Sequence, residues 1–396
     1  MNTIVIVGAS LAGLRAAEAL RAEGFTGAIR LVGGEDHLPY DRPPLSKQIL
    51  SGAWQPDRIV LQPDPVADLG ADLLLATWAT GLDPTRKVVT TSGGDLDYDG
   101  CILATGSVVR TLPGQPDLAG IHTLRTVDDA LALRADLDAV PSRVVVIGAG
   151  FIGSEVAATA RGRGLDVTVL EGLPVPLRRG LGERMGLRMA QVHRDNGVDL
   201  RLDVTVQAIE GEDRVQQVRL ADGTVIPADV VVVAVGVRPA TDWLQECGLT
   251  INDGVVCDER LVAGPGLVAA GYLVRWPNRR FATHMRIEHW ENAVEQGRAA
   301  ALSLLNGPAA EPFAPVPWFW SDQYDTKIQM AGWPGADAQV EVVEEDESAG
   351  RLVALYGRDE KVVGVLGLNR PRQVMQYRMK IEAGLGWDEA IAAARS

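Results

Sequence analysis

A glycine-rich turn in the middle of this chain of 396 residues has the clearest potential for chemistry. Gly148, Gly150 and Gly153 form a G-x-G-x-x-G pattern, with Phe151 and Ile152 before the last glycine. In this pattern the first glycine permits a tight turn, the second lets the backbone approach a pyrophosphate, and the third lets the next helix pack closely on the strand. The pyrophosphate then lies at the helix N-terminus, where unpaired N–H groups favour negative charge. The turn therefore predicts a dinucleotide site.

An acidic residue should follow such a turn by about 20 residues, where it binds the ribose hydroxyls. Glu171 stands 23 residues after Gly148, at the end of an expected strand over residues 166–170. A carboxylate at this position repels the ribose phosphate of NADPH, so we expect NADH to be preferred. Arg178 and Arg179 follow soon after and could weaken that preference. The alternative interpretation is a glycine turn that holds no nucleotide.

A second turn near the N-terminus repeats the pattern less regularly. Its sequence is Gly8-Ala9-Ser10-Leu11-Ala12-Gly13. Ser10 replaces the middle glycine, but serine is small and its hydroxyl could donate a hydrogen bond to a phosphate. Glu35 is the acidic candidate for the ribose, slightly beyond the usual spacing. We expect a second nucleotide site here, changed but not abolished by the serine.

Each turn joins a short apolar strand to an alanine-rich helix. The expected strands cover residues 3–7 and 143–147, and the helices reach about residues 23 and 163. Further strands follow at residues 28–32 and 166–170. Both repeats are typical of the first half of a βαβ unit. The sequence thus predicts an α/β protein with two Rossmann-like dinucleotide-binding domains and a small α+β domain at the C-terminus.

Composition narrows the function further. The net charge is −14, which disfavours binding to a nucleic-acid backbone. Three cysteines, Cys101, Cys247 and Cys257, form no C-x-x-C pair, so no local redox dithiol is expected. The histidines lack metal-ligand spacing, and no apolar run has the length of a membrane span. An apolar strand begins directly at the N-terminus, from which we expect a cytoplasmic protein.

Several longer motifs are more specific than either glycine turn. They are LPYDRPPLSK at 38–47, LATG at 103–106, Glu155, VGVRP at 235–239, RIEHWEN at 286–292 and WFWSDQYD at 318–325. With these motifs in this order, nearly the whole chain resembles the NADH-dependent ferredoxin reductases that serve Rieske oxygenases and bacterial cytochrome monooxygenases. Members of that family share the glutathione reductase-like superfold.

The resemblance implies both the activity and the domains. NADH would deliver a hydride to FAD, and electrons would then pass singly to a small two-iron two-sulfur ferredoxin or a rubredoxin. An FAD domain would comprise residues 1–112 and 239–312, an NADH domain residues 113–238, and an interface domain residues 313–396. The protein would be a monomer or a dimer.

The resemblance also implies roles for particular residues. Lys47 would pair with Glu155 beside the reactive part of the flavin, and Trp320 would complete the catalytic group. A lysine there would stabilise the negative charge left by hydride transfer. The other residues implied to line a cofactor are Arg42, Ala79, Ala104, Thr105, Gly106, Gly236, Gly271, Glu288, His289 and Trp290.

One position departs from the family pattern. Tyr272 follows Gly271 where the family has an aspartate that binds the ribityl chain of FAD. Loss of that charge-assisted bond would cost about 1.5–3 kcal/mol. One alternative that Tyr272 leaves open is a flavin-depleted binding protein that keeps the fold. A separate alternative, independent of Tyr272, is an NADH oxidase without a protein partner.

A short basic run lies within this acidic chain. It contains Arg275, Arg279, Arg280 and Arg286. The run is interpreted either as solvated surface or as a docking patch for an acidic ferredoxin. Because the chain is itself acidic, docking of an acidic ferredoxin would depend on such a patch and would weaken as salt screens it.

Overall fold

The computed structural model describes residues 1–335 and 337–395. The chain divides into two compact units, each built from three segments. Unit 1 comprises residues 1–41, 59–108 and 238–319, and unit 2 comprises residues 42–58, 109–237 and 320–396. Residues 42–58 thus cluster with unit 2, and the residue bounds expected for the three domains stay a prediction.

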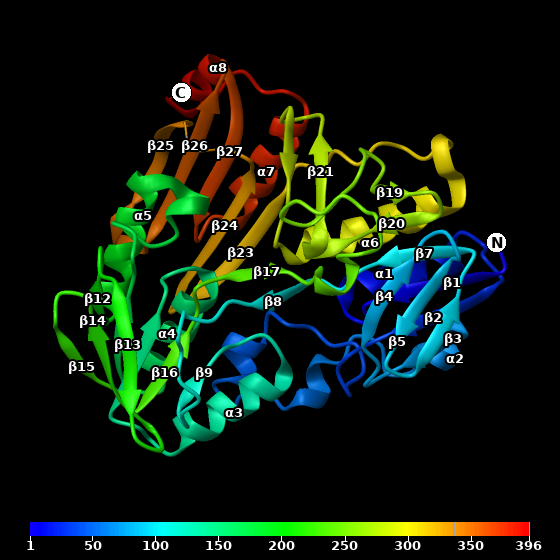
Figure 1. Ribbon diagram of the computed structural model, residues 1–396. Helices are drawn as coiled ribbons and strands as arrows, with labels where there is room; N and C mark the ends of the chain where they lie inside the picture. The colour runs from blue at the N-terminus through cyan, green and yellow to red at the C-terminus, as the bar shows by residue number, and fades with distance from the viewer. Residues whose placement is uncertain (336, 396) are drawn as a thin grey trace. The chain divides into compact units, whose positions relative to one another are not determined.

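Unit 1 is built on a six-stranded sheet of order β19-β20-β7-β1-β2-β3 (Figure 1). Its central strand β1 pairs in parallel with β2 and β7, and Ile4, Val5 and Ile6 on it are fully buried. Such apolar runs are typical of parallel strands covered on both faces. The strands are β1 (Thr3–Val7), β2 (Ala28–Val32), β3 (Ala71–Leu74), β7 (Gly100–Leu103), β19 (Val262–Gly264) and β20 (Leu267–Ala269).

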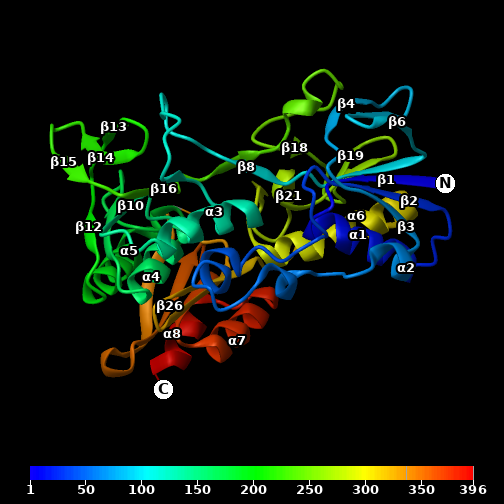
Figure 2. The ribbon, with the colours of Figure 1, turned by 90° about the horizontal axis from the view of Figure 1, so that it is seen from below.

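Helices α1 (Leu11–Ala22) and α6 (Trp290–Asn306) lie side by side on this sheet (Figure 2). They approach closely because Gly297 faces α1: a Cβ there would lie 2.4 Å from the carbonyl oxygen of Ala12. The smaller elements of unit 1 are β4 (Ala79–Asp83), β5 (Val88–Thr91), β6 (Gly94–Asp97), β18 (Val255–Val256), β21 (Val274–Asn278), β22 (Thr283–Met285) and α2 (Pro65–Leu69).

Unit 2 contains the second strand–turn–helix repeat. Its parallel sheet has the order β12-β11-β10-β16-β9, and α4 follows β10 as expected. The elements are β9 (Ile121–His122), β10 (Arg143–Ile147), β11 (Asp166–Leu170), β12 (Asp199–Arg201), β16 (Val230–Val233), α3 (Val127–Asp138), α4 (Phe151–Gly162) and α5 (Arg178–Asp195). A small antiparallel sheet joins β13 (Val206–Gly211), β14 (Val215–Leu220) and β15 (Val225–Pro227).

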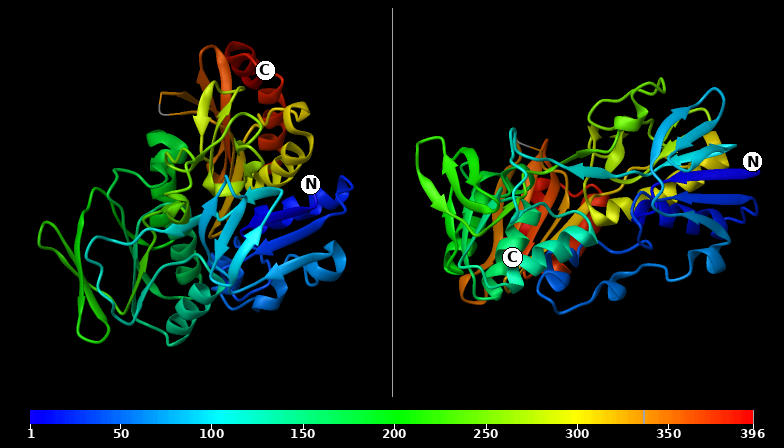
Figure 3. Two further views of the ribbon diagram at one scale, coloured as in Figure 1. Left: turned by 45° about the vertical axis from the view of Figure 1, so that its right-hand side comes forward. Right: turned by 60° about the horizontal axis from the view of Figure 1, so that its bottom comes forward.

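The C-terminal part of the chain is an antiparallel sheet with helices, which confirms an α+β arrangement (Figure 3). Its order is β23-β24-β27-β26-β25, with α7 (Pro371–Glu382) packed on β24 and β27. The strands are β23 (Trp318–Gln323), β24 (Thr326–Gly332), β25 (Gln339–Asp346), β26 (Arg351–Arg358) and β27 (Lys361–Leu368), and α8 (Trp387–Arg395) ends the chain.

Candidate functional site

The first glycine turn follows β1 in unit 1. The φ of Gly8 is +124°, and a Cβ there would lie 2.1 Å from the carbonyl oxygen of Ala104. A Cβ on Gly13 would lie 1.9 Å from the carbonyl oxygen of Gly8. Neither position has room for a side chain, so the tight turn and the close approach of α1 depend on glycine. This is the backbone geometry that a dinucleotide requires.

Ser10 is the N-cap residue of α1. Its backbone is extended, and its side chain makes no capping hydrogen bond. The hydroxyl is therefore not used to close the helix. The N–H groups of Leu11, Ala12 and Gly13 lie in the first helical turn, where an α-helix offers them no partner. The turn thus fits a phosphate group in spite of the serine.

Glu35 follows β2, as the acid of the first repeat should. The hydroxyl of Tyr40 donates a hydrogen bond to Oε2 of Glu35 at 2.5 Å. The Ala76 N–H donates to the Glu35 carbonyl at 3.1 Å, so Glu35 is held beside the segment that leads to β4. Ala79 is the first residue of that strand.

The predicted residues after β7 are fixed by backbone contacts inside unit 1. The hydroxyl of Thr105 donates to the Ala240 carbonyl at 2.9 Å, and the Ala240 N–H donates to the Gly106 carbonyl at 3.0 Å. Ala104 is buried at the end of β7, against Gly8. These residues therefore lie at the carboxyl end of the sheet, beside the first turn.

Gly271 and Tyr272 begin a short 3-10 helix, Gly271–Leu273. The Gly271 N–H donates to Oε1 of Gln296 on α6 at 2.9 Å, while the fully buried Nε2 of Gln296 has no hydrogen-bond partner. The carbonyl of Tyr272 accepts a hydrogen bond from Arg286 at 3.4 Å. A buried amide without an acceptor is the kind of group that a bound cofactor can satisfy.

The predicted residues at the start of α6 have different surroundings. The indole N–H of Trp290 donates to Asp41 at 2.6 Å, and Glu288 forms an ion pair with Arg286 at 2.6 Å. His289 lies against the ring of Phe319, with centroids 4.7 Å apart. Burial lowers the pKa of His289 to about 4, and its Nδ1 has no hydrogen-bond partner. A neutral, half-buried imidazole fits a contact with a cofactor better than it fits proton transfer.

The second glycine turn, in unit 2, repeats the geometry of the first. The φ of Gly148 is +102°, and a Cβ there would lie 2.5 Å from the carbonyl oxygen of Ala234. A Cβ on Gly153 would lie 2.0 Å from the Gly148 carbonyl oxygen, whereas one on Gly150 would meet no atom within 4 Å. The space over Gly150 is where a pyrophosphate would approach the backbone. Phe151 and Ile152 begin α4, and Ile152 is exposed.

Glu171 is bonded to the backbone of the second turn. Its Oε2 accepts a hydrogen bond from the Ala149 N–H at 2.7 Å, and its Oε1 accepts one from the Leu173 N–H at 2.9 Å. The carboxylate is therefore fixed at the end of β11. Arg178 is exposed on α5, with its guanidinium 4.0 Å from Glu183. The open position of Gly236, at a φ of +100°, lies after β16.

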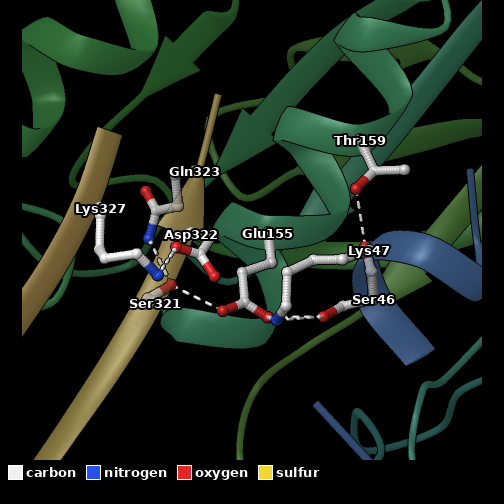
Figure 4. Close-up of polar contacts among 8 residues, drawn as sticks. All are labelled: Ser46, Lys47, Glu155, Thr159, Ser321, Asp322, Gln323 and Lys327. Carbon is white, nitrogen blue, oxygen red and sulfur yellow. Dashed lines mark hydrogen bonds and ion pairs between the residues drawn. The ribbon is translucent and has the colours of Figure 1, made fainter. Parts of the chain in front are cut away.

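Lys47 and Glu155 form an ion pair in unit 2 (Figure 4). Their Nζ and Oε2 atoms are 2.6 Å apart, and the side chains are only 14% and 5% exposed. Lys47 lies on a π-helical turn, Leu45–Ile49, and Glu155 lies on α4. The pair implied by the family resemblance is present, while its place beside a cofactor stays a prediction.

Two serines hold the other positions around the Glu155 carboxylate. Ser46 donates to Oε2 at 2.5 Å and Ser321, on β23, donates to Oε1 at 2.7 Å. The side-chain amide of Gln323 donates in turn to the Ser321 hydroxyl at 3.2 Å. Thr159 donates to the Ser46 carbonyl at 2.7 Å and fixes the π-helical turn on α4. Neither serine was among the predicted site residues, although Ser46 lies within the motif at 38–47 and Ser321 within the motif at 318–325.

The predicted site residues are shared between the units. Arg42, in unit 2, donates a hydrogen bond from its guanidinium to the Arg125 carbonyl at 2.6 Å, and Trp320 lies on β23. Unit 1 contains Gly8, Ser10, Leu11, Ala12, Gly13, Glu35, Ala79, Ala104, Thr105, Gly106, Gly271, Tyr272, Glu288, His289 and Trp290. Unit 2 contains Arg42, Lys47, Gly148, Gly150, Phe151, Ile152, Gly153, Glu155, Glu171, Arg178, Gly236 and Trp320.

Three polar side chains, those of His193, Tyr324 and Ser154, form a buried cluster that no sequence motif indicates. The ring of His193 is fully buried on α5, with Nδ1 2.8 Å from the Tyr324 hydroxyl and Nε2 3.2 Å from the Ser154 hydroxyl. Burial lowers the pKa of His193 to about 4 and raises the pKa of Tyr324. The group joins α4, α5 and the β23–β24 turn inside unit 2.

The basic run is partly neutralised in the structure. Arg279 pairs with Glu259, and Arg286 lies 3.1 Å from Asp253 and 2.6 Å from Glu288. Arg275 and Arg280 donate to backbone carbonyls, those of Asn252 and Ala314. Arg279 and Arg280 are the exposed members of the run.

Other kinds of site find little support in the described residues. Within residues 1–335 and 337–395, no group of three or more potential His, Cys, Asp or Glu ligands gathers for a metal ion. None of the helices in that part of the chain is long and apolar enough to cross a membrane. Cys101 and Cys257 are buried free thiols, and burial raises the pKa of Cys257 to about 12. Such thiols are inert.

Comparison with known families covers almost the whole chain. Residues 2–297 match the pyridine nucleotide-disulphide oxidoreductase family, and residues 318–396 match the C-terminal domain family of reductases. Rhodocoxin reductase of Rhodococcus erythropolis is 39% identical over 382 residues, covering 95% of this chain and 88% of that protein. Putidaredoxin reductase of Pseudomonas putida is 34% identical over 406 residues, covering 98% and 95% of the two chains.

Solved structures agree with the sequence relatives. The covalent complex of putidaredoxin reductase with putidaredoxin contains a chain that matches with a TM-score of 0.93 at 33% identity, covering 100% of this chain and 99% of that one. A structure named Fdr9 matches with a TM-score of 0.89 at 38% identity, covering 98% and 97%. The expected fold, two Rossmann-like domains followed by a C-terminal domain, is therefore confirmed.

Proposed function

Because the chain belongs to the pyridine nucleotide-disulphide oxidoreductase family, we propose that it carries electrons from NADH through FAD to a small iron-sulfur ferredoxin. Within the family it belongs with the ferredoxin reductases of oxygenase systems, such as those for anthranilate and benzene. It is an oxidoreductase that uses a nicotinamide dinucleotide and a flavin. The observation that carries the proposal is a match over 95% of the length of putidaredoxin reductase, together with two strand–turn–helix repeats whose first and last glycines leave no room for a side chain.

The chain offers a separate dinucleotide turn for each cofactor. In unit 1, the N-terminus of α1 and Ser10 would bind the pyrophosphate of FAD, and Glu35 would bind its ribose. In unit 2, the open backbone at Gly150 and the fixed carboxylate of Glu171 would bind NADH. FAD, when bound, supplies the chemistry that accepts a hydride and releases single electrons.

The ion pair of Lys47 and Glu155 would act electrostatically. An ammonium group with little contact with water stabilises negative charge that develops near it during hydride transfer. Glu155 holds that ammonium in one place, and the hydroxyls of Ser46 and Ser321 hold the carboxylate. The carboxylate is thus shared by three donors, which restricts both its rotamer and the direction of Lys47.

Arg279 and Arg280 would give the ferredoxin a local positive surface on an acidic protein. Opposite charge at a docking site raises the association rate more than the affinity. The ion pair between Arg279 and Glu259 partly neutralises the positive charge of this surface. We therefore expect Glu259 to lower the rate at which the ferredoxin docks.

The visible spectrum of the purified protein tests the function directly. We expect a yellow protein whose flavin absorbance is bleached by NADH under anaerobic conditions. Turnover with a two-iron two-sulfur ferredoxin should then exceed direct reduction of oxygen, which separates a ferredoxin reductase from an NADH oxidase. A protein that stays colourless after incubation with FAD would overturn the proposal.

A further inference from the structure

Trp78 is a large apolar side chain that is 62% exposed in unit 1. It immediately precedes β4, and Ser92 fixes its backbone on both sides. The Trp78 N–H donates to the Ser92 hydroxyl at 3.0 Å, and the Trp78 carbonyl accepts from the Ser92 N–H at 2.8 Å. The backbone is thus well anchored while most of the indole surface remains in solvent.

One face of the indole lies on the segment that carries the ribose acid. A Cβ added to Gly34 would lie 2.7–2.8 Å from three atoms of the six-membered ring, Cδ2, Cε2 and Cε3. These nearly equal distances place Gly34 over the ring plane. The Thr77 N–H donates to the Gly33 carbonyl at 2.9 Å and fixes the two segments together. Only glycine leaves room for the ring at position 34.

We propose that Trp78 binds the adenine of FAD by stacking on the purine. The inference rests on the proposed function, which assigns FAD to unit 1. With the pyrophosphate at the turn near Gly8 and the ribose at Glu35, the base must lie beyond Glu35, on the side away from the turn. The indole lies next to Glu35, and flat aromatic side chains can stack on any nucleobase because every base has a flat π-face.

Stacking on the adenine would also give the exposed indole of Trp78 a binding partner. Purine stacking removes apolar ring surface from water on both partners. Stacking on one aromatic side chain changes affinity by roughly five- to a hundredfold. The contribution of Trp78 would therefore be comparable with the loss expected from Tyr272, and it acts at the other end of the cofactor.

Three ligands of the apoprotein separate adenine binding from flavin binding. FAD contains both groups, ADP contains only the adenine end, and FMN contains only the flavin end. We expect Trp78→Ala to weaken FAD and ADP by about tenfold or more and to leave FMN unchanged. Trp78→Phe should retain most of the affinity, because it keeps a flat ring.

Trp54→Ala is the matched control. Trp54 is a partly exposed tryptophan in unit 2, with the Arg58 guanidinium 4.6 Å from its ring, and its replacement should leave all three dissociation constants unchanged. Equal affinity of wild type and Trp78→Ala for FAD and ADP would overturn the inference, and so would an equal loss for FMN. Failure of the proposed function would appear differently, as a wild-type protein that binds no FAD.

Discussion

Nζ of Lys47 lies 2.6 Å from Oε2 of Glu155, although 108 residues separate them in the sequence. The two side chains are nearly buried, and the carboxylate also accepts hydrogen bonds from Ser46 and Ser321. A buried ion pair adds little net stability, because desolvation offsets the attraction, but removal of one partner leaves an uncompensated charge. The pair is therefore better explained by charge placement than by stability.

Glu155→Gln should destabilise the protein by about 3–5 kcal/mol, because the Lys47 ammonium loses its partner while still buried. Lys47→Met combined with Glu155→Gln should recover much of that loss. Urea unfolding of the single and the double variant measures the loss in free energy of unfolding. Lys327→Met is the control, since Lys327 pairs with Asp322 at the surface at 2.6 Å and should cost less than about 1 kcal/mol. The same loss in Glu155→Gln and Lys327→Met would contradict the prediction.

The geometry of the two glycine turns was predictable because it depends on local spacing, whereas their binding of cofactors stays a prediction. Gly8, Gly13, Gly148 and Gly153 make close contacts that follow from a strand–turn–helix pattern. The pairing of Lys47 with Glu155 could be stated only from family resemblance, because tertiary folding alone brings them together. His193 and Tyr324 were missed for the same reason: they lie 131 residues apart, and neither stands in a pattern that indicates a partner.

Glu171→Gln should raise the preference for NADPH over NADH by about tenfold. Glu171 is fixed by the Ala149 and Leu173 N–H groups, so its charge cannot turn away from a ribose phosphate. The ratio of kcat/KM for the two nucleotides measures the change. Glu210→Gln removes a carboxylate that pairs with Arg219 on the small sheet of unit 2, and should leave the ratio unchanged. An unaltered ratio in Glu171→Gln would contradict the role of Glu171.

Tyr272→Asp should strengthen FAD binding about ten- to a hundredfold. The substitution restores a charge-assisted hydrogen-bond acceptor next to Gly271, and such a bond contributes about 1.5–3 kcal/mol. Titration of the apoprotein with FAD gives the dissociation constant. Tyr272→Phe serves as the control, because it removes the hydroxyl without adding an acceptor. Unchanged affinity in Tyr272→Asp would show that this position does not limit FAD binding.

His193 should make the protein less stable in acid. Burial lowers its pKa to about 4 from a usual 6.5, so between these values the unfolded chain binds a proton that the folded chain does not. The free energy of unfolding therefore falls as the pH is lowered from 6.5 towards 4, by about 2 kcal/mol between pH 7 and pH 5.

His193→Gln should remove this contribution, and urea unfolding at pH 7, 6 and 5 measures it. Part of the acid sensitivity should remain in the variant, because burial also lowers the pKa of His289 to about 4. The same difference in stability between pH 7 and pH 5 in wild type and variant would contradict the prediction.

Substitutions at Arg279 and at Glu259 should change the rate of ferredoxin docking in opposite directions. Arg279→Gln removes an exposed positive charge and should slow ferredoxin association several-fold at low salt. Glu259→Gln frees the Arg279 guanidinium from its ion pair and should accelerate association. Both effects should fade as ionic strength approaches 0.5 M, because the screening length falls to a few ångströms.

Stopped-flow reduction of ferredoxin by the NADH-reduced protein measures these rates. Bleaching of the flavin by NADH should be the same in both variants, since neither residue belongs to a predicted cofactor site. Both the protein and its partner are expected to be acidic, so any substitution that makes the protein less negative would reduce their general repulsion and accelerate association. Any substitution that makes it more negative would slow association, wherever on the surface it lies. Asp388→Asn on α8 supplies that comparison: it adds the same charge change as Glu259→Gln, so an equal acceleration by both would locate no docking surface at Arg279.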